Sequence, residues 1–320
     1  MTFLKQTSLI LLIFSGAIIL TGKLYTAWAV RQAERNFPPA GKFITVNGIR
    51  MHYVRKGKGR PVVFIHGSFG SLYYFTHSIF DAASREYDAI AFDQPGYGYS
   101  ERPAGTNMML KDHAAYLHEA LKQLGIEKPV LAAHSWGSGA ALAYALEYPE
   151  DLSALVLING YVRPAPPPVD LEYRIPIMPV IGKLFLECFF VPAGKIQALT
   201  RSSQTFAPNA EDKEYVRVVA NLGLRPMTYQ WNAQDIRNCS PSLRTMVARY
   251  GSIRVPVFIM AGDSDTVASP ERHAQWLHEL IPGSHLTVLP QTGHQIVFAK
   301  REETLKVLEE AQNQIIQAKI

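Results

Sequence analysis

The sequence contains little cysteine and few charged residues for its length of 320 residues. Its two cysteines, Cys188 and Cys239, lie far apart in the chain, which excludes a small disulfide-held domain and a cysteine-rich metal site. Charged residues make up 18% of the chain and aromatic residues 11%, a composition that excludes intrinsic disorder. What remains is a globular protein with enough apolar residues to bury a large core.

Acidic residues are nearly absent from the N-terminal part of the chain. Residues 1–60 hold ten of the 32 Lys and Arg residues but a single acid, Glu34, which gives a balance of +9. Residues 61–320 hold 22 basic and 26 acidic residues, a balance of −4. The net positive charge therefore belongs to the N-terminal stretch, and this distribution argues against a nucleic-acid partner.

A long apolar run, residues 8–20, lies near the N-terminus. No charge lies between Lys5 and Lys23, and the intervening stretch would rise about 25 Å as a helix, the short limit for crossing a bilayer. Residues typical of a membrane–water interface follow at Tyr25, Trp28, Arg31 and Arg35. We predict that residues 1–35 form a membrane anchor with a basic flank, so that the membrane is a partner of this protein.

Two other interpretations of the N-terminal segment remain open. Ala27-Trp28-Ala29 resembles the small-residue site at which a signal peptide is cut, and the protein would then be exported. The approach to that site is long and carries Lys23, which favours the uncleaved anchor. The third interpretation is a hydrophobic helix that docks on the protein itself.

Short apolar runs typical of buried strands recur along the chain. Phe43–Val46 and Ile49–Val54 flank an Asn47-Gly48 turn and predict a hairpin. The other runs are Val62–Ile65, Ala89–Phe92, Val130–Ala133, Leu155–Ile158, Val255–Ala261 and Leu286–Leu289. Segments with helical periodicity alternate with them at Met109–Leu124, Gly137–Tyr148, Pro270–Leu280 and Glu302–Gln317. This alternation predicts an α/β fold whose mostly parallel, eight-stranded sheet carries helices on both faces.

Residues 163–250 interrupt the alternation of strands and helices. They open with a proline-rich stretch and continue as apolar, helix-like pieces without clear strands. An insertion of this size between two strands is most simply a cap over the strand ends. We therefore predict one domain over residues 36–320, with a helical cap inserted at about residues 163–250 and a hydrophobic pocket beneath it.

A serine lies at the junction between a predicted strand and a predicted helix. Ser135 follows the apolar run Val130–Ala133, and small residues, Ala133 and Gly137, lie two positions to either side. Small neighbours allow strand and helix to approach closely around a strained nucleophile turn. The serine hydroxyl would project above the sheet near a helix N-terminus, where developing negative charge is favoured.

Serine needs a base and an acid to act as a nucleophile near neutral pH. Candidate acids, Asp263 and Asp265, follow the run Val255–Ala261, and His294 lies in the loop after the last predicted strand. Each candidate therefore falls just past the C-terminal end of a strand. The chain order Ser, Asp, His is the one expected of an α/β hydrolase.

From about residue 43 to residue 318 the chain resembles the α/β-hydrolase family, in particular its capped esterase, lactonase, dehalogenase and epoxide-hydrolase branch. The matching motifs are His66-Gly67-Ser68-Phe69-Gly70, Asp93-Gln94-Pro95-Gly96-Tyr97-Gly98-Tyr99-Ser100, the Ser135 turn, Gly262–Asp265 and Gly293-His294. They occur in the family's order and at reasonable spacing.

The resemblance implies roles for individual residues. Ser135 would attack an acyl carbonyl, His294 would take its proton, and Asp265 would orient the imidazole. Asp263 is the rival acid, and Asp265 is favoured because the family's acid lies three residues after the glycine. The resemblance also implies an oxyanion hole made by the backbone N–H groups of Ser68 and Trp136. The side chains of Phe69 and Trp136 are predicted to lie near the substrate.

The identity of the nucleophile limits the reactions that the predicted enzyme could catalyse. Dehalogenases and epoxide hydrolases of this branch use a carboxylate, because water can later attack the carbonyl of the resulting alkyl ester. An ether formed on Ser135 would have no such carbonyl, so serine predicts acyl transfer. No dinucleotide-binding glycine motif fits the sequence, and the histidines show no metal-ligand spacing, so no cofactor or metal is predicted.

These observations predict a serine hydrolase that cleaves a small apolar ester or lactone through an acyl-enzyme, with a carboxylesterase-like Ser-Asp-His triad. A small peptidase or amidase similar to proline iminopeptidase is the alternative enzyme. A non-catalytic receptor that reuses the hydrolase scaffold is the alternative from another class.

Overall fold

The apolar runs become the strands of one sheet in the computed structural model, which describes residues 2–166 and 170–317. The strands are β1 (Lys42–Val46), β2 (Ile49–Lys56), β3 (Pro61–Ile65), β4 (Asp88–Phe92), β5 (Val130–His134), β6 (Ala154–Ile158), β7 (Val257–Gly262) and β8 (His285–Leu289). Their order is β1-β2-β4-β3-β5-β6-β7-β8. β2 pairs antiparallel with β1 and β4, and the remaining neighbours are parallel.

Helices cover both faces of the sheet, which explains why its central strands are apolar throughout. One face packs on α4 (Leu110–Gln123), α5 (Trp136–Glu147) and α11 (Trp276–Leu280). The other packs on α2 (Tyr73–Thr76), α3 (Phe80–Ala83), α12 (Ile296–Ala299) and α13 (Arg301–Gln317). Short turns η1 (Pro149–Asp151) and η5 (Glu271–Gln275) complete this layer structure. The predicted α/β fold with its eight-stranded, mostly parallel sheet is confirmed.

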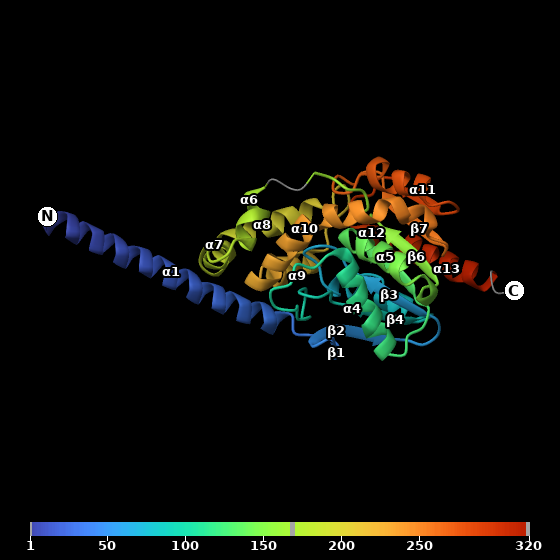
Figure 1. Cartoon of the computed structure of the whole chain (residues 1–320), viewed down its shortest axis with the longest axis horizontal. Coiled ribbons are helices and arrows are strands. Elements are labelled where there is room, and N and C mark those ends of the chain that lie inside the picture. The colour runs from blue at the N-terminus through green and yellow to red at the C-terminus, as the bar shows by residue number, and fades with distance from the viewer. Residues whose placement is uncertain (1, 167–169, 318–320) are drawn as a thin grey trace.

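A run of helices connects β6 to β7. Its elements are α6 (Leu171–Arg174), η2 (Ile175–Ile177), α7 (Ile181–Phe185), η3 (Leu186–Phe190), α8 (Val191–Gln204), α9 (Lys213–Leu222), α10 (Pro226–Met246) and η4 (Val247–Ser252). We call residues 171–246 the cap. The insertion predicted at residues 163–250 includes residues 167–169, which lie outside the described residues. Figure 1 shows the cap helices between the sheet and the N-terminal helix.

The N-terminal half of helix α1 (Thr2–Asn36) projects away from the rest of the molecule (Figure 1). The helix runs unbroken through the basic flank that the sequence placed after the apolar run. Its part Gln6–Asn36 is long and apolar enough to cross a membrane, with a mean hydropathy of 1.9, and a signal sequence would pass the same test. The C-terminal half of α1 lies against η3, α8 and α9 of the cap.

Candidate active site

Ser135 occupies a strained turn between β5 and α5. Its backbone has φ of +53° and ψ of −123°, a region that non-glycine residues rarely adopt. The turn depends on two glycines that lie close to Ser135 in space, Gly137 and Gly67. A Cβ at Gly137 would lie 2.4 Å from the carbonyl oxygen of His66, and a Cβ at Gly67 would lie 2.9 Å from the Cβ of Ser135. The close approach of these loops therefore explains the small residues around the serine.

His294 lies between Ser135 and Asp265. Its Nε2 is 2.9 Å from the Ser135 Oγ, and its Nδ1 is 2.7 Å from the Asp265 Oδ2. Asp265 accepts a hydrogen bond from the Nδ1–H group of His294. The other ring nitrogen, Nε2, is therefore unprotonated and can accept the proton of the serine hydroxyl. All three side chains are buried. The structure thus brings together three residues that the sequence separates by as many as 159 positions.

The electrostatics of the site favour an ionised Asp265. Burial opposes ionisation, but the hydrogen bond and charge of His294 and the N–H groups of Ala268 and Val267 outweigh it, so the pKa of Asp265 is lowered. Its Oδ1 accepts those N–H groups at 3.0 and 2.7 Å. Asp263 is exposed and accepts from the Ser264 hydroxyl instead of from His294. Of the two candidate acids, Asp265 is the one that contacts the histidine.

The loop that carries His294 is fixed from below by polar groups. The Asn159 Nδ2 donates to the carbonyl oxygens of Gly293 and His294, at 2.9 and 3.0 Å. His134 contacts the same His294 oxygen through its Nε2, at 3.0 Å. Burial lowers the pKa of His134 well below its ordinary value, so a neutral ring donates this hydrogen bond. These contacts hold the backbone of the loop at Gly293 and His294.

The residues predicted to form the oxyanion hole line the same cavity as Ser135. Trp136 is the first residue of α5, and the first N–H groups of a helix have no acceptor within it. The Ser68 N–H donates to no group in the described part of the chain. Ser68 and Trp136 both line one cavity with Ser135 and His294. Two residues that line the cavity with Ser135 therefore carry backbone N–H groups that could donate to a ligand.

The cavity above Ser135 measures about 630 Å³ and lies under the cap. Its aromatic lining comes from Phe69, Trp136, Tyr161, Tyr173, Phe190, Tyr215 and Tyr229. The ring of Phe69 packs against Tyr229 with centroids 5.4 Å apart. Trp136 is more deeply placed: its ring stacks on Tyr97 and meets the edge of His113. A cavity of this size and lining fits a small apolar ligand.

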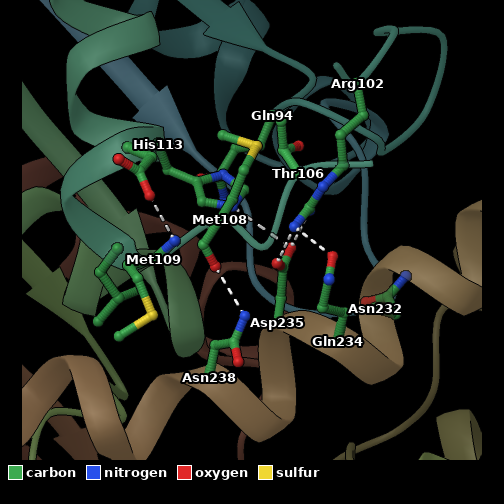
Figure 2. Close-up of polar contacts among 12 residues, drawn as sticks. Gln94, Arg102, Thr106, Met108, Met109, His113, Asn232, Gln234, Asp235 and Asn238 are labelled. Carbon is green, nitrogen blue, oxygen red and sulfur yellow. Dashed lines mark hydrogen bonds and ion pairs between the residues drawn. The ribbon is translucent and has the colours of Figure 1, made fainter. Parts of the chain in front are cut away.

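Cap helix α10 supplies residues that the motif search did not single out. The Asn232 Oδ1 accepts the N–H of Phe69 at 2.6 Å, and its Nδ2 donates to Thr228. Phe69 has a φ of +57°, so a cap residue holds the loop beside Ser68 in an unusual conformation. Figure 2 shows Asn232 on the same helix as Asp235, which pairs with Arg102. Nothing in the sequence of the insertion indicates which helix face would meet the sheet domain.

Hydrogen bonds join the serine, the histidine and the aspartate in series at the carboxyl ends of the strands of a mostly parallel sheet. This arrangement is typical of an α/β hydrolase. The chain belongs to the alpha/beta hydrolase fold family, whose model matches residues 60–300. The resemblance drawn from the sequence motifs is confirmed.

Individual relatives are distant and differ in activity. The chain is 25% identical over 280 residues to a cis-3-alkyl-4-alkyloxetan-2-one decarboxylase from Shewanella oneidensis, covering 82% of this chain and 85% of that protein. It is 25% identical over 288 residues to a proline iminopeptidase from Saccharolobus solfataricus, covering 84% and 90%. A thermophilic esterase from Thermogutta terrifontis superposes with a TM-score of 0.71 at 19% identity, covering 86% and 99%. The last likeness shows the fold alone.

Proposed function

We propose that this protein is a serine hydrolase that cleaves an apolar carboxylic ester or lactone through an acyl-enzyme. The observation that carries the proposal is the hydrogen-bonded series Ser135–His294–Asp265 at the floor of an aromatic-lined cavity. The decarboxylase relative supports the substrate class, because an oxetan-2-one is a four-membered lactone. No step of this chemistry requires a metal or an organic cofactor.

In the first half-reaction, His294 Nε2 takes the proton of Ser135 Oγ as that oxygen attacks the carbonyl carbon of the substrate. The negative charge that develops on the carbonyl oxygen is stabilised by the N–H groups of Ser68 and Trp136. Asp265 stabilises the imidazolium. The bond to the alcohol oxygen then breaks, His294 gives its proton to the leaving alkoxide, and the acyl group remains on Ser135.

In the second half-reaction, a water molecule attacks the acyl-enzyme. His294 takes a proton from the water and returns it to Ser135 Oγ as the carboxylic acid leaves. A lactone would follow the same course, with the alcohol and the acid released as one hydroxy acid.

A peptidase acting on a free N-terminus is the second candidate function, supported by the proline iminopeptidase relative. Such an enzyme needs a carboxylate in its pocket to bind the substrate ammonium. Glu172 lines the cavity, but its carboxylate is paired with Arg201. The cavity therefore favours an uncharged ester or lactone over an aminoacyl substrate.

An activity assay of the full-length protein in detergent tests the choice between an esterase and a peptidase. Its substrates are p-nitrophenyl esters of increasing chain length, an alkyl β-lactone and prolyl p-nitroanilide. We expect turnover of the esters and the lactone, with little turnover of the anilide. Preferential cleavage of the anilide would overturn the ester assignment. A chain that turns over none of them and does not react with a fluorophosphonate would point to a receptor on the hydrolase scaffold.

We also propose that α1 anchors the protein in a membrane, since no described residue of its most apolar stretch is buried against the rest of the molecule. We expect the full-length chain to remain in the membrane pellet after a carbonate wash. Deletion of residues 1–18 serves as the control and is expected to weaken that retention. Release of the full-length chain by carbonate would contradict the anchor, and a shortened mature chain would indicate a cleaved signal peptide.

Asn232 is proposed as a positioning residue for the oxyanion hole. Asn232→Leu removes the acceptor for the Phe69 N–H and frees the adjacent Ser68 loop. Because a small misplacement of a catalytic group is costly, we expect kcat to fall by about 10- to 100-fold. KM should change much less than kcat, since the contact of the oxyanion hole with the substrate oxygen strengthens in the transition state.

The matched control for this prediction is Asn238→Leu on the same helix. Asn238 also binds the sheet domain, through Asn107 and Met108, but it does not touch the Ser68 loop. We expect it to leave kcat nearly unchanged. Equal losses of kcat in both variants, or a loss confined to KM, would show that α10 has only a structural role.

A further inference from the structure

The N-terminal helix meets the cap without a spacer between them. The face of α1 that packs on the protein begins at the half-buried Ile19 and continues through the buried Gly22, Thr26 and Ala33. At Gly22 the contact is so close that a Cβ would lie 2.0 Å from the carbonyl oxygen of Cys188 in η3. The contact with the cap therefore starts inside the uncharged stretch of the helix.

The two lysines that bound the uncharged stretch of α1 indicate where the cap would lie relative to the surface of a bilayer. Lys5 and Lys23 bound the uncharged residues, and they are about 27 Å apart along the helix axis. A hydrocarbon core is about 30 Å thick, so lysines at these positions belong at the two headgroup regions. Lys23 forms an ion pair with Glu187 of η3 at 3.3 Å. A membrane that holds α1 thus has its surface at η3.

Apolar side chains are exposed on this part of the cap. They are Met178, Val180, Ile181, Leu184 and Phe189, which we call the cap patch. Val180 is 81% exposed and Ile181 57%. Val180 also has a φ of +61°, an outlier for a β-branched residue, so the turn before α7 directs an apolar side chain outward. Clustered apolar exposure of this kind marks an interaction surface.

Basic residues accompany the cap patch. Arg174, Lys183 and Lys195 are exposed on the same part of the cap. Two of the acids of this region are paired, Glu187 with Lys23 and Lys183, and Glu172 with Arg201, while Asp170 is exposed at the start of α6. Exposed apolar side chains accompanied by exposed basic residues match the interface of a bilayer that contains anionic lipids.

We propose that the cap patch docks on the same lipid bilayer that holds α1, and that the active site takes its ester from that bilayer. The second part rests on the proposed function and specifies its substrate class, a carboxylic ester or lactone with a membrane-soluble hydrocarbon portion. Element η3 borders both the cap patch and the cavity, because Phe189 is exposed and Phe190, the next residue, lines the cavity. Substrate would pass from the interface into the aromatic pocket without entering bulk water.

The docking is tested by fluorescence of the full-length chain in vesicles of phosphatidylcholine and phosphatidylglycerol. Both native cysteines are buried, so an environment-sensitive NBD label can be directed to Ile181→Cys. The control label is Ile316→Cys on α13, which is exposed and lies at the end of the molecule opposite α1 (Figure 1). We expect blue-shifted emission and quenching by doxyl lipids at position 181 only. Water-like, unquenched emission at 181 in chains that float with the vesicles would overturn the docking.

Substrate uptake is tested with the double variant V180E/I181E. We expect activity on a short, water-soluble ester to stay within about twofold, because the substitutions do not touch Ser135 or His294. Activity on a long-chain ester dispersed in the vesicles should fall by about tenfold or more. Unchanged activity on the vesicle ester, or an equal loss on both esters, would overturn the uptake route. Failure of the hydrolase proposal would differ, since the unsubstituted chain would then cleave neither ester while the quenching result still stood.

Discussion

Replacing Ser135 with alanine is expected to lower ester turnover by about 10⁴-fold or more, the largest effect that a single substitution in this chain should have. Without Oγ no acyl-enzyme can form, and His294 retains only the ability to activate water. Ser135→Ala should also abolish covalent labelling by a fluorophosphonate probe. The measurements are initial rates on the best ester of the chain-length series and probe labelling of the purified protein.

Ser138→Ala is the matched control for the nucleophile. Ser138 lies one turn further along α5, is buried, and donates its hydroxyl proton to the Ala133 carbonyl oxygen. Its loss should alter stability slightly and leave labelling intact. Labelling that survives Ser135→Ala would show that another serine is the nucleophile. The melting temperature of Ser135→Ala should stay near that of the unsubstituted chain, which separates lost chemistry from lost folding.

Breaking the ion pair between Arg102 and Asp235 is expected to lower the free energy of unfolding by about 3–5 kcal/mol. Both side chains have no solvent exposure, and two hydrogen bonds of 2.8 and 2.7 Å join them. Figure 2 shows the pair between a loop of the sheet domain and cap helix α10, with Gln234 and His113 beside it. Asp235→Asn leaves a buried guanidinium without its counter-ion, and urea unfolding measures the cost.

Two further variants test whether the loss of unfolding free energy comes from leaving one charge buried without its partner. The double variant R102M/D235L should recover much of the lost stability, because apolar side chains can replace a buried ion pair. The exposed pair Arg249–Glu147, at 2.6 Å, is the surface control and should contribute about 1 kcal/mol or less. If Asp235→Asn cost no more than Glu147→Gln, the buried pair would not hold the cap to the sheet domain.

The pH dependence of this stabilisation has a definite sign. Burial raises the pKa of Asp235, but His113 and Arg102 outweigh it and the net pKa is lowered. A carboxyl whose pKa is lower in the folded state stabilises the fold above its unfolded pKa of about 4. That contribution is lost as the pH falls from this value through the lowered folded-state pKa. The difference in unfolding free energy between the unsubstituted chain and Asp235→Asn should therefore shrink in acid.

Much of the sheet and the candidate site could be predicted from local sequence patterns. Val130–Ala133 is apolar throughout because helices cover both faces of its strand, and this pattern is visible without coordinates. Ser135 and Gly137 are confined to one tight turn, so their spacing is fixed by chain geometry alone. Asp265 and His294 each follow a strand, and parallel strands end at one edge of a sheet. At these positions, patterns within a few residues were sufficient to predict the structure.

The contacts of the cap could not be predicted in the same way. Asn232 and Asp235 lie on one helix face, but no periodic signal tells which core loop that face will meet, since their partners Phe69 and Arg102 are more than 130 residues away in the chain. The sequence of α1 likewise favoured an anchor but left a signal peptide and a docked helix open, because all three have a long apolar run.

The sequence by itself determined the sheet, the family and the order of the candidate catalytic residues, because each depends on neighbours within a few positions. Only the tertiary structure decided that Asp265 and not Asp263 contacts His294, that α10 holds the Phe69 loop, and that α1 packs on the cap at Gly22. Those outcomes depend on how elements distant in the chain fit together, and the local spacing of residues does not specify which distant surface an element will meet.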